Sequence, residues 1–218
     1  MKHNIDRHTM TSNSHRPPKP SSILYEHFFE YLHPVGSVHT RFEMAFRRWS
    51  KPHLLNNCRI SRLATAAIAN LQWLSRDVPP RIHLAVIRLH LNAWHTARRY
   101  QRRSGCLFCS NQAAEDSIEH LFFCPVVQSV FPAHLKKGCP PRVSVINLLL
   151  FQLSKKDRVM ISLVWHAIYT THNMYRHSPD RGEFRKTICK IISEAGSTPP
   201  LHSIQNELIQ SLQCGRLT

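Results

Sequence analysis

The sequence predicts a mainly α-helical fold, a small helical domain built around a cluster of cysteine and histidine residues and preceded by a disordered basic tail. Three observations support this prediction. Apolar residues recur at helical spacing in several segments, three cysteines and one histidine lie within nineteen residues of one another, and the first residues are polar and rich in proline.

The N-terminal part divides into a tail and a basic helical region. Residues 1–22 mix polar and basic residues with three prolines and show no apolar period, which predicts disorder. Residues 23–104 form the basic helical region. Its first expected helices are Ile23–Leu32, Val38–Trp49 and Asn57–Leu74, the last with a clear apolar stripe at a spacing of 3.6 residues.

The next expected helix runs from Arg81 to about Arg103, opened by a proline pair. Two apolar faces would pack this helix on both sides. Between the faces lies a polar strip whose members are three or four residues apart and therefore share one side of a helix. The strip consists of Arg88, Asn92, His95, Arg99 and Arg103. This strip is a candidate ridge facing phosphate groups; a merely solvated face is the alternative.

The C-terminal helical region, residues 140–196, is expected to hold the segments Val143–Leu153, Asp157–His177 and Glu183–Glu194. The first two are apolar nearly all round, which predicts burial and makes His166 and His172 core histidines. Four charged residues interrupt this apolar stretch, so no transmembrane segment is expected. Residues 197–218 are expected to be a loose tail with one short helix.

The cysteine and histidine cluster has the spacing C-x2-C-x10-H-x3-C and lies within residues 105–135. Its members are Cys106, Cys109, His120 and Cys124. A turn aims the first two sulfurs at one point, and a short helix presents the other two side chains about one turn apart. Asp116 is expected to cap that helix, with Glu119 completing a capping box. The pattern predicts a structural zinc site.

Other interpretations of the same residues are weaker. A redox C-x-x-C would need βαβ surroundings, which this sequence lacks. A zinc deaminase would need an H-x-E ahead of its cysteines, and no H-x-E precedes Cys106. Ordinary buried thiols would not need this spacing. Cys139 is a possible substitute ligand, beside a proline pair. The odd count of seven cysteines and the metal-like spacing of four of them favour a reducing intracellular compartment.

Charge is the second informative feature. The chain has 29 Lys and Arg against 13 Asp and Glu, a net charge of +16. Between Arg41 and Gly105 there are thirteen basic residues and two acidic ones. Such an excess attracts a polyanion through counterion release, so we expect RNA or DNA, bound mainly through its backbone; an anionic membrane is the weaker alternative.

The residues expected to contact nucleic acid are arginines, one histidine and one tyrosine. They are Arg88, His95, Arg98, Arg99, Tyr100, Arg102 and Arg103. The run from Arg98 to Arg103 sets an aromatic ring among guanidinium groups, which suits stacking on an unpaired base as well as contact with phosphate.

Residues 80–135 resemble the zinc-binding region C-terminal to the polymerase in non-LTR (LINE-type) retrotransposon reverse transcriptases. The resemblance rests on Leu91–Tyr100, Gly105–Cys109 and Glu115–Pro125, although four residues more commonly separate the histidine from the last cysteine, and three do here. It implies the four zinc ligands given above and binding of template RNA or target DNA by a module without catalytic residues.

No Tyr-x-Asp-Asp motif and no phosphate-binding Gly-x4-Gly-Lys loop occurs in the sequence, so we expect no enzymatic activity. The chain would then be a piece of a retroelement polyprotein, a domesticated gene or a decayed element. The competing hypothesis is a zinc-stabilised protein-interaction module; a metal nuclease using Asp116 or Glu119 ranks third. We expect an intracellular, nuclear location, with the cytoplasm as the alternative.

Overall fold

The computed structural model describes residues 37–49, 60–101, 104–109, 111, 113–136, 144–151, 153–177, 183–195 and 199–214. Within these ranges the protein is mainly helical and has no strand, which confirms the predicted fold class. The expected tail at 1–22, the expected helix Ile23–Leu32, the arginines Arg102 and Arg103, and Cys139 lie outside the described residues. No helix among the described residues is both long and apolar enough to cross a membrane.

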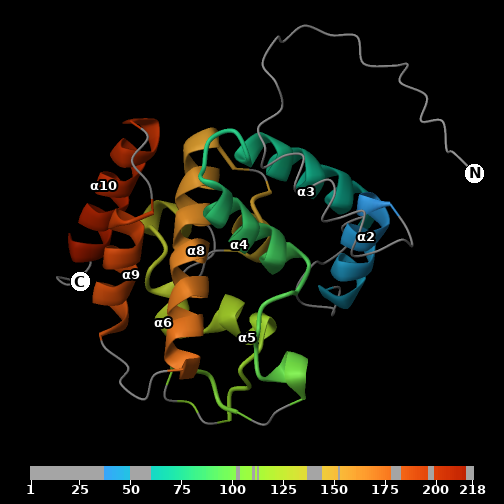
Figure 1. The fold of residues 1–218 in the computed structure, drawn as a ribbon, viewed down its shortest axis with the longest axis horizontal. Coiled ribbons are helices and arrows are strands. Elements are labelled where there is room, and N and C mark those ends of the chain that lie inside the picture. Colours follow the sequence, from blue (N-terminus) through green and yellow to red (C-terminus); the bar gives the residue numbers. More distant parts are fainter. Residues whose placement is uncertain are drawn as a thin grey trace, which may run out of the picture. The chain divides into compact units, whose positions relative to one another are not determined.

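The longest helix, α8 (Lys155–His177), forms the centre of the fold. Ten consecutive residues, from Val159 to Ile168, are buried, because this segment is apolar on nearly every side and can only be stable when other helices surround it. Helix α4 (Pro80–His90) packs on one side of α8, and α9 (Phe184–Ser193) and α10 (Pro199–Cys214) pack on another, as Figure 1 shows.

The N-terminal helices α2 (Val38–Trp49) and α3 (Ile60–Leu74) pack against each other and against α4. Their predicted bounds agree with the structure, although residues 57–59 at the expected start of α3 lie outside the described residues. The buried stripe of α3 consists of Leu63, Ala64, Ala67, Leu71 and Leu74. This stripe contains five of the residues that carried its helical period in the sequence.

Two tryptophans fix the junction between α8 and the segment that follows α4. Trp94 and Trp165 are both fully buried, and their rings meet edge to face at 5.6 Å. Each indole N–H donates to a backbone carbonyl, that of Trp94 to Ala85 and that of Trp165 to Leu148. Satisfied N–H groups allow both large rings to be buried without an uncompensated polar atom.

The expected long helix from Arg81 to Arg103 is wrong. Helix α4 ends at His90, and Asn92 then takes a φ of 50°, a left-handed conformation that asparagine tolerates better than most residues. The chain turns there and brings Trp94 into the core. A separate 3-10 turn, η1 (Arg98–Tyr100), follows. The polar strip is therefore not a continuous helical ridge.

Two further expectations need correction. Among the described residues of the segment Val143–Leu153, only the short helix α7 (Val145–Leu148) is present, because Leu150 turns the chain with a φ of 66° while its side chain stays buried. Residues 197–218 are not a loose tail with a short helix. They contain the sixteen-residue helix α10, which buries Leu201, Leu208 and Leu212 against α8 and α9.

Two buried histidines make the fold sensitive to acid. Burial lowers the pKa of His83 to about 4 and that of His166 to about 4, against 6.5 in an unfolded chain. Both imidazoles are therefore neutral in the folded protein at neutral pH. Because the unfolded chain takes up protons first, stability is lost as the pH falls from about 6.5 towards 4.

We predict that His166→Leu reduces this loss. Urea unfolding followed by circular dichroism at pH 7 and pH 4.5 should show an acid-induced fall in unfolding free energy that is smaller in the variant by roughly 2 kcal/mol. An equal fall in both proteins would contradict the assignment of a neutral buried imidazole at this position.

Candidate metal centre

The four predicted ligands come together. The donor atoms of Cys106, Cys109, His120 and Cys124 all lie within 4.8 Å of one another. Cys106 and Cys124 are buried, and the other two side chains are partly buried. The structure therefore shows a Cys3His cluster that is close enough to bind a metal ion.

Two of the distances between donor atoms match the edges of a tetrahedral site. The sulfurs of Cys106 and Cys124 are 3.9 Å apart, and Cys109 Sγ lies 3.4 Å from His120 Nε2. A tetrahedron with Zn–S bonds of about 2.3 Å and a Zn–N bond of about 2.05 Å has S–S edges of about 3.8 Å and S–N edges of about 3.6 Å. The donor set thus fits a four-coordinate metal.

The first two ligands lie on a loop closed by backbone hydrogen bonds. Cys106 N donates to Ala114 O at 2.7 Å, and Gly105 forms an isolated antiparallel bridge with Glu115. Beyond Cys106 the chain turns back, and Phe108 N donates to the Cys106 sulfur at 3.4 Å. An N–H directed at sulfur favours the thiolate that a metal requires.

The other two ligands come from α5 (Ile118–Phe123) and the residue that ends it. Cys124 N donates to His120 O, so the two side chains lie one turn apart as predicted. Pro125 then starts α6 (Pro125–Gln128) at its first position, where a missing N–H costs nothing.

The predicted capping box is wrong. Ser117 is the N-cap of α5, and its hydroxyl accepts a hydrogen bond from His120 N at 3.1 Å. Glu119 instead forms an ion pair with Arg98, as does Glu115. Serine is as good a cap as aspartate, so the local sequence allowed either residue to take this position.

Asp116 does not cap α5. It is instead the buried link between the cysteine loop and the rest of the protein. It is 2% exposed. Its carboxylate accepts hydrogen bonds from Ala97 N at 2.8 Å and from His172 Nε2 at 2.8 Å. Its backbone N–H donates to Ser104 O, and its carbonyl accepts from Arg98 N. Asp116 thereby joins the loop, the η1 segment and helix α8.

His172 is a core histidine, as predicted, and is fully buried. Aromatic packing strengthens the same junction. The ring of Phe108, from the cysteine loop, lies 5.8 Å from the His172 ring and 4.9 Å from the ring of Phe184 at the start of α9. Sequence reasoning did not find this role of Phe108, because its partners are more than sixty residues away.

The two buried cysteines are joined by a hydrogen bond between their sulfur atoms. The hydrogen bond from Cys124 lowers the pKa of the Cys106 thiol to about 5, and the same bond raises the pKa of Cys124. The thiolate form of Cys106 is therefore favoured. A thiolate is the form of cysteine that ligates a metal, so the lowered pKa of Cys106 favours metal binding.

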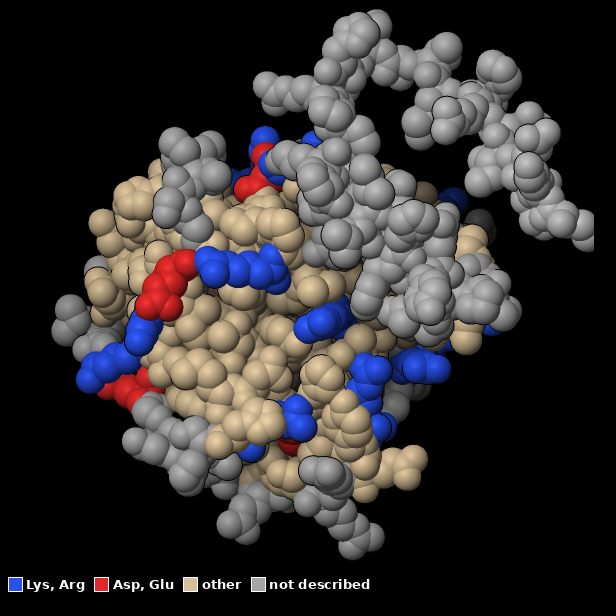
Figure 2. All heavy atoms as spheres, in the orientation of Figure 1, with Lys and Arg blue, Asp and Glu red and all other residues tan. Residues whose placement is uncertain are grey.

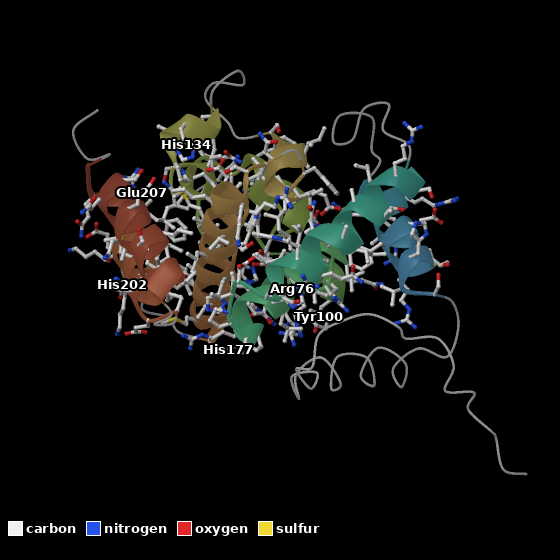
Figure 3. The ribbon with its side chains drawn as sticks, turned by 90° about the horizontal axis from the view of Figure 1, so that it is seen from above. Arg76, Tyr100, His134, His177, His202 and Glu207 are labelled. Carbon is white, nitrogen blue, oxygen red and sulfur yellow. The ribbon has the colours of Figure 1, made fainter. Side chains whose placement is uncertain are left out.

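The residues predicted to contact nucleic acid fall into two groups. Arg88, Arg99 and Tyr100 lie near His95. Arg98 instead lies 3.4 Å from Glu115 and 3.8 Å from Glu119. The charge of Arg98 is therefore balanced within the protein. Tyr100 is 48% exposed and lies near the margin of the molecule in Figure 3.

The charged side chains on the face that Figure 2 presents are mostly basic. Blue Lys and Arg side chains outnumber red acidic ones there, and several blue side chains lie near one another in the lower right of the view. The charge excess of the sequence is thus present at the surface of the folded protein.

We predict that Asp116→Asn lowers the free energy of unfolding by about 2 to 4 kcal/mol. The carboxylate accepts hydrogen bonds from two N–H groups, whereas the amide of asparagine would accept from only one of them and direct its own N–H at the other. Ser117→Ala, the neighbouring control, should cost only about 1 kcal/mol for a lost cap. Urea denaturation of both variants measures the difference. A cost of Asp116→Asn no larger than that of the control would refute the linking role.

The structure thus combines a Cys3His cluster that is close enough to bind a metal ion with a face, shown in Figure 2, whose charged side chains are mostly basic. No protein-family model matches the chain, and no curated protein or solved structure is similar enough to it to count as a match.

Proposed function

We propose that this chain is a zinc-stabilised module that binds nucleic acid and has no catalytic role. The observation that carries the proposal is the combination of a four-ligand Cys3His centre with a net charge of +16 in the same chain. The first feature supplies a rigid structure, and the second supplies attraction to phosphate groups.

The donor set supports zinc as the metal. Three sulfurs and one imidazole nitrogen favour zinc over calcium and magnesium, which prefer oxygen ligands. With all four positions supplied by Cys106, Cys109, His120 and Cys124, a tetrahedral ion keeps no open position for a water molecule. Such a site contributes folding free energy. The metal would hold the cysteine loop against α5 and would do no chemistry.

The charge supports a nucleic acid as the partner. Counterion release from a polyanion gives a basic protein binding free energy without any base-specific contact, so no sequence specificity is proposed. The resemblance of residues 80–135 to the zinc-binding region of non-LTR retrotransposon reverse transcriptases points to the same class of partner. Origin as a retroelement piece or remnant remains part of this proposal.

A protein-interaction module is the second candidate. Three large apolar side chains are exposed in α2 and α8, namely Val38, Met44 and Met174. Scattered apolar residues are common on protein surfaces, and these three lie on two different helices. We therefore rank this function below nucleic-acid binding.

We predict that the purified protein binds a short oligothymidylate with an affinity that falls steeply as salt rises. Reversing three charges in Arg99→Glu/Arg102→Glu/Arg103→Glu should lower the magnitude of the log–log salt slope by about 2, at roughly 0.7 per lost phosphate contact. Fluorescence anisotropy at several salt concentrations measures this slope. Arg98 is left unchanged because it forms ion pairs inside the protein.

The matched control is Arg48→Glu/Arg62→Glu/Arg76→Glu, which changes the net charge equally at exposed positions of α2, α3 and the turn after α3. The control should keep most of the salt slope. Binding that hardly changes with salt, or that tolerates both sets of reversals, would contradict the proposal. A protein partner captured by both variants would then favour the second candidate.

A further inference from the structure

Three arginines from separate elements lie near enough to His95 to act on it electrostatically. Arg88 comes from α4, Arg99 from η1 and Arg176 from the last turn of α8. All three, together with His172, act on the His95 ring electrostatically, and with partial burial they lower the pKa of that imidazole. Arg176 was not among the residues expected from the sequence, because it lies eighty-one residues beyond His95.

A pair of stacked aromatic rings holds one of these cations, Arg176. The His95 and Tyr100 rings are stacked in parallel, with centroids 5.9 Å apart and an interplanar angle of 3°. The guanidinium carbon of Arg176 lies 5.9 Å from the centroid of the same Tyr100 ring. Tyr100 is 48% exposed and lies near the edge of the molecule in the view of Figure 3. The stack is therefore accessible from outside.

The other two arginines are held by oxygen atoms of uncharged groups. Arg88 donates to the Tyr169 hydroxyl and lies 5.6 Å from the centroid of that ring. Arg99 donates to the backbone carbonyl of Asn92 at 3.4 Å. These contacts orient the guanidinium groups without neutralising them.

Within the described residues, no carboxylate forms an ion pair with the three arginines of this cluster, Arg88, Arg99 and Arg176, whereas the adjacent Arg98 contacts two carboxylates. Gathering three cations around a histidine is electrostatically unfavourable in the free protein. A bound anion would offset this repulsion, because each arginine is attracted to the anion.

We propose that Arg88, Arg99 and Arg176 form a phosphate-binding site around His95. Guanidinium groups bind phosphate oxygens through paired N–H donors, and three preoriented groups suit the several oxygens of one phosphate. The site takes a phosphate group, either of a nucleic-acid backbone or free in solution. If the phosphate belongs to a nucleic acid, the inference rests on the proposed function above. The site is then the place on the protein where the nucleic-acid backbone is bound.

The test uses the full chain and two probes. Inorganic phosphate is titrated while the His95 imidazole signal is followed by NMR, with His95→Gln identifying the signal. Phosphate should move the signal in a saturable way and raise the pKa of His95. A short oligothymidylate is titrated in parallel by fluorescence anisotropy.

The test variant is Arg99→Gln/Arg176→Gln, and the control is Arg48→Gln/Arg62→Gln, which removes the same charge from exposed positions of α2 and α3. Arg88 is left in place because it packs on Tyr169. The test variant should bind the oligonucleotide at least tenfold more weakly than the control, with a salt slope smaller by about 1.4. Its His95 signal should not respond to phosphate.

The outcomes separate this inference from the proposed function. Oligonucleotide binding that weakens equally in both variants would overturn the site and leave the proposed function intact. A saturable phosphate response without oligonucleotide binding would support the site, identify free phosphate as the source and overturn the proposed function. No response to either probe in the wild-type protein would overturn both, and this measurement does not depend on the folding of any variant.

Discussion

The buried carboxylate of Asp116 is the interaction on which the rest of the structure depends. It accepts hydrogen bonds from the backbone of the η1 segment and from His172 of α8, while its own backbone closes the cysteine loop at Ser104. A buried carboxylate is costly unless its oxygens are satisfied, and here each oxygen has a short hydrogen bond. The geometry of three chain segments is therefore fixed at one residue.

This constraint connects the metal centre to the basic surface. The Cys3His cluster joins the cysteine loop to α5, and Asp116 links that loop to Ala97 through its carboxylate and to Arg98 through its backbone carbonyl. Arg99 and Tyr100 follow immediately in the same 3-10 turn. In our account, the metal thus positions the arginine and the aromatic ring that would meet a phosphate backbone, although it touches neither.

The sequence predicted the parts of this arrangement that depend on local patterns. Helical period marked α2, α3, α8 and α9, and ligand spacing marked all four members of the metal cluster. It did not predict the parts decided by distant contacts. The helix break at Asn92 is not marked by a glycine or a proline. The burial of Trp94 against Trp165 determines where the helix ends, and this contact is not visible in the local sequence. Arg176 and His172 likewise join their sites across more than fifty residues, and local periodicity contains no signal of such a pairing.

The central claim is that a structural zinc ion holds this module together. The most direct test is native mass spectrometry of the purified protein, combined with circular dichroism before and after chelation. The account predicts one zinc ion per chain, with helicity falling when the chelator removes it, and no zinc in Cys109→Ser. A metal-free wild-type protein with full helicity, unchanged by the chelator, would contradict it.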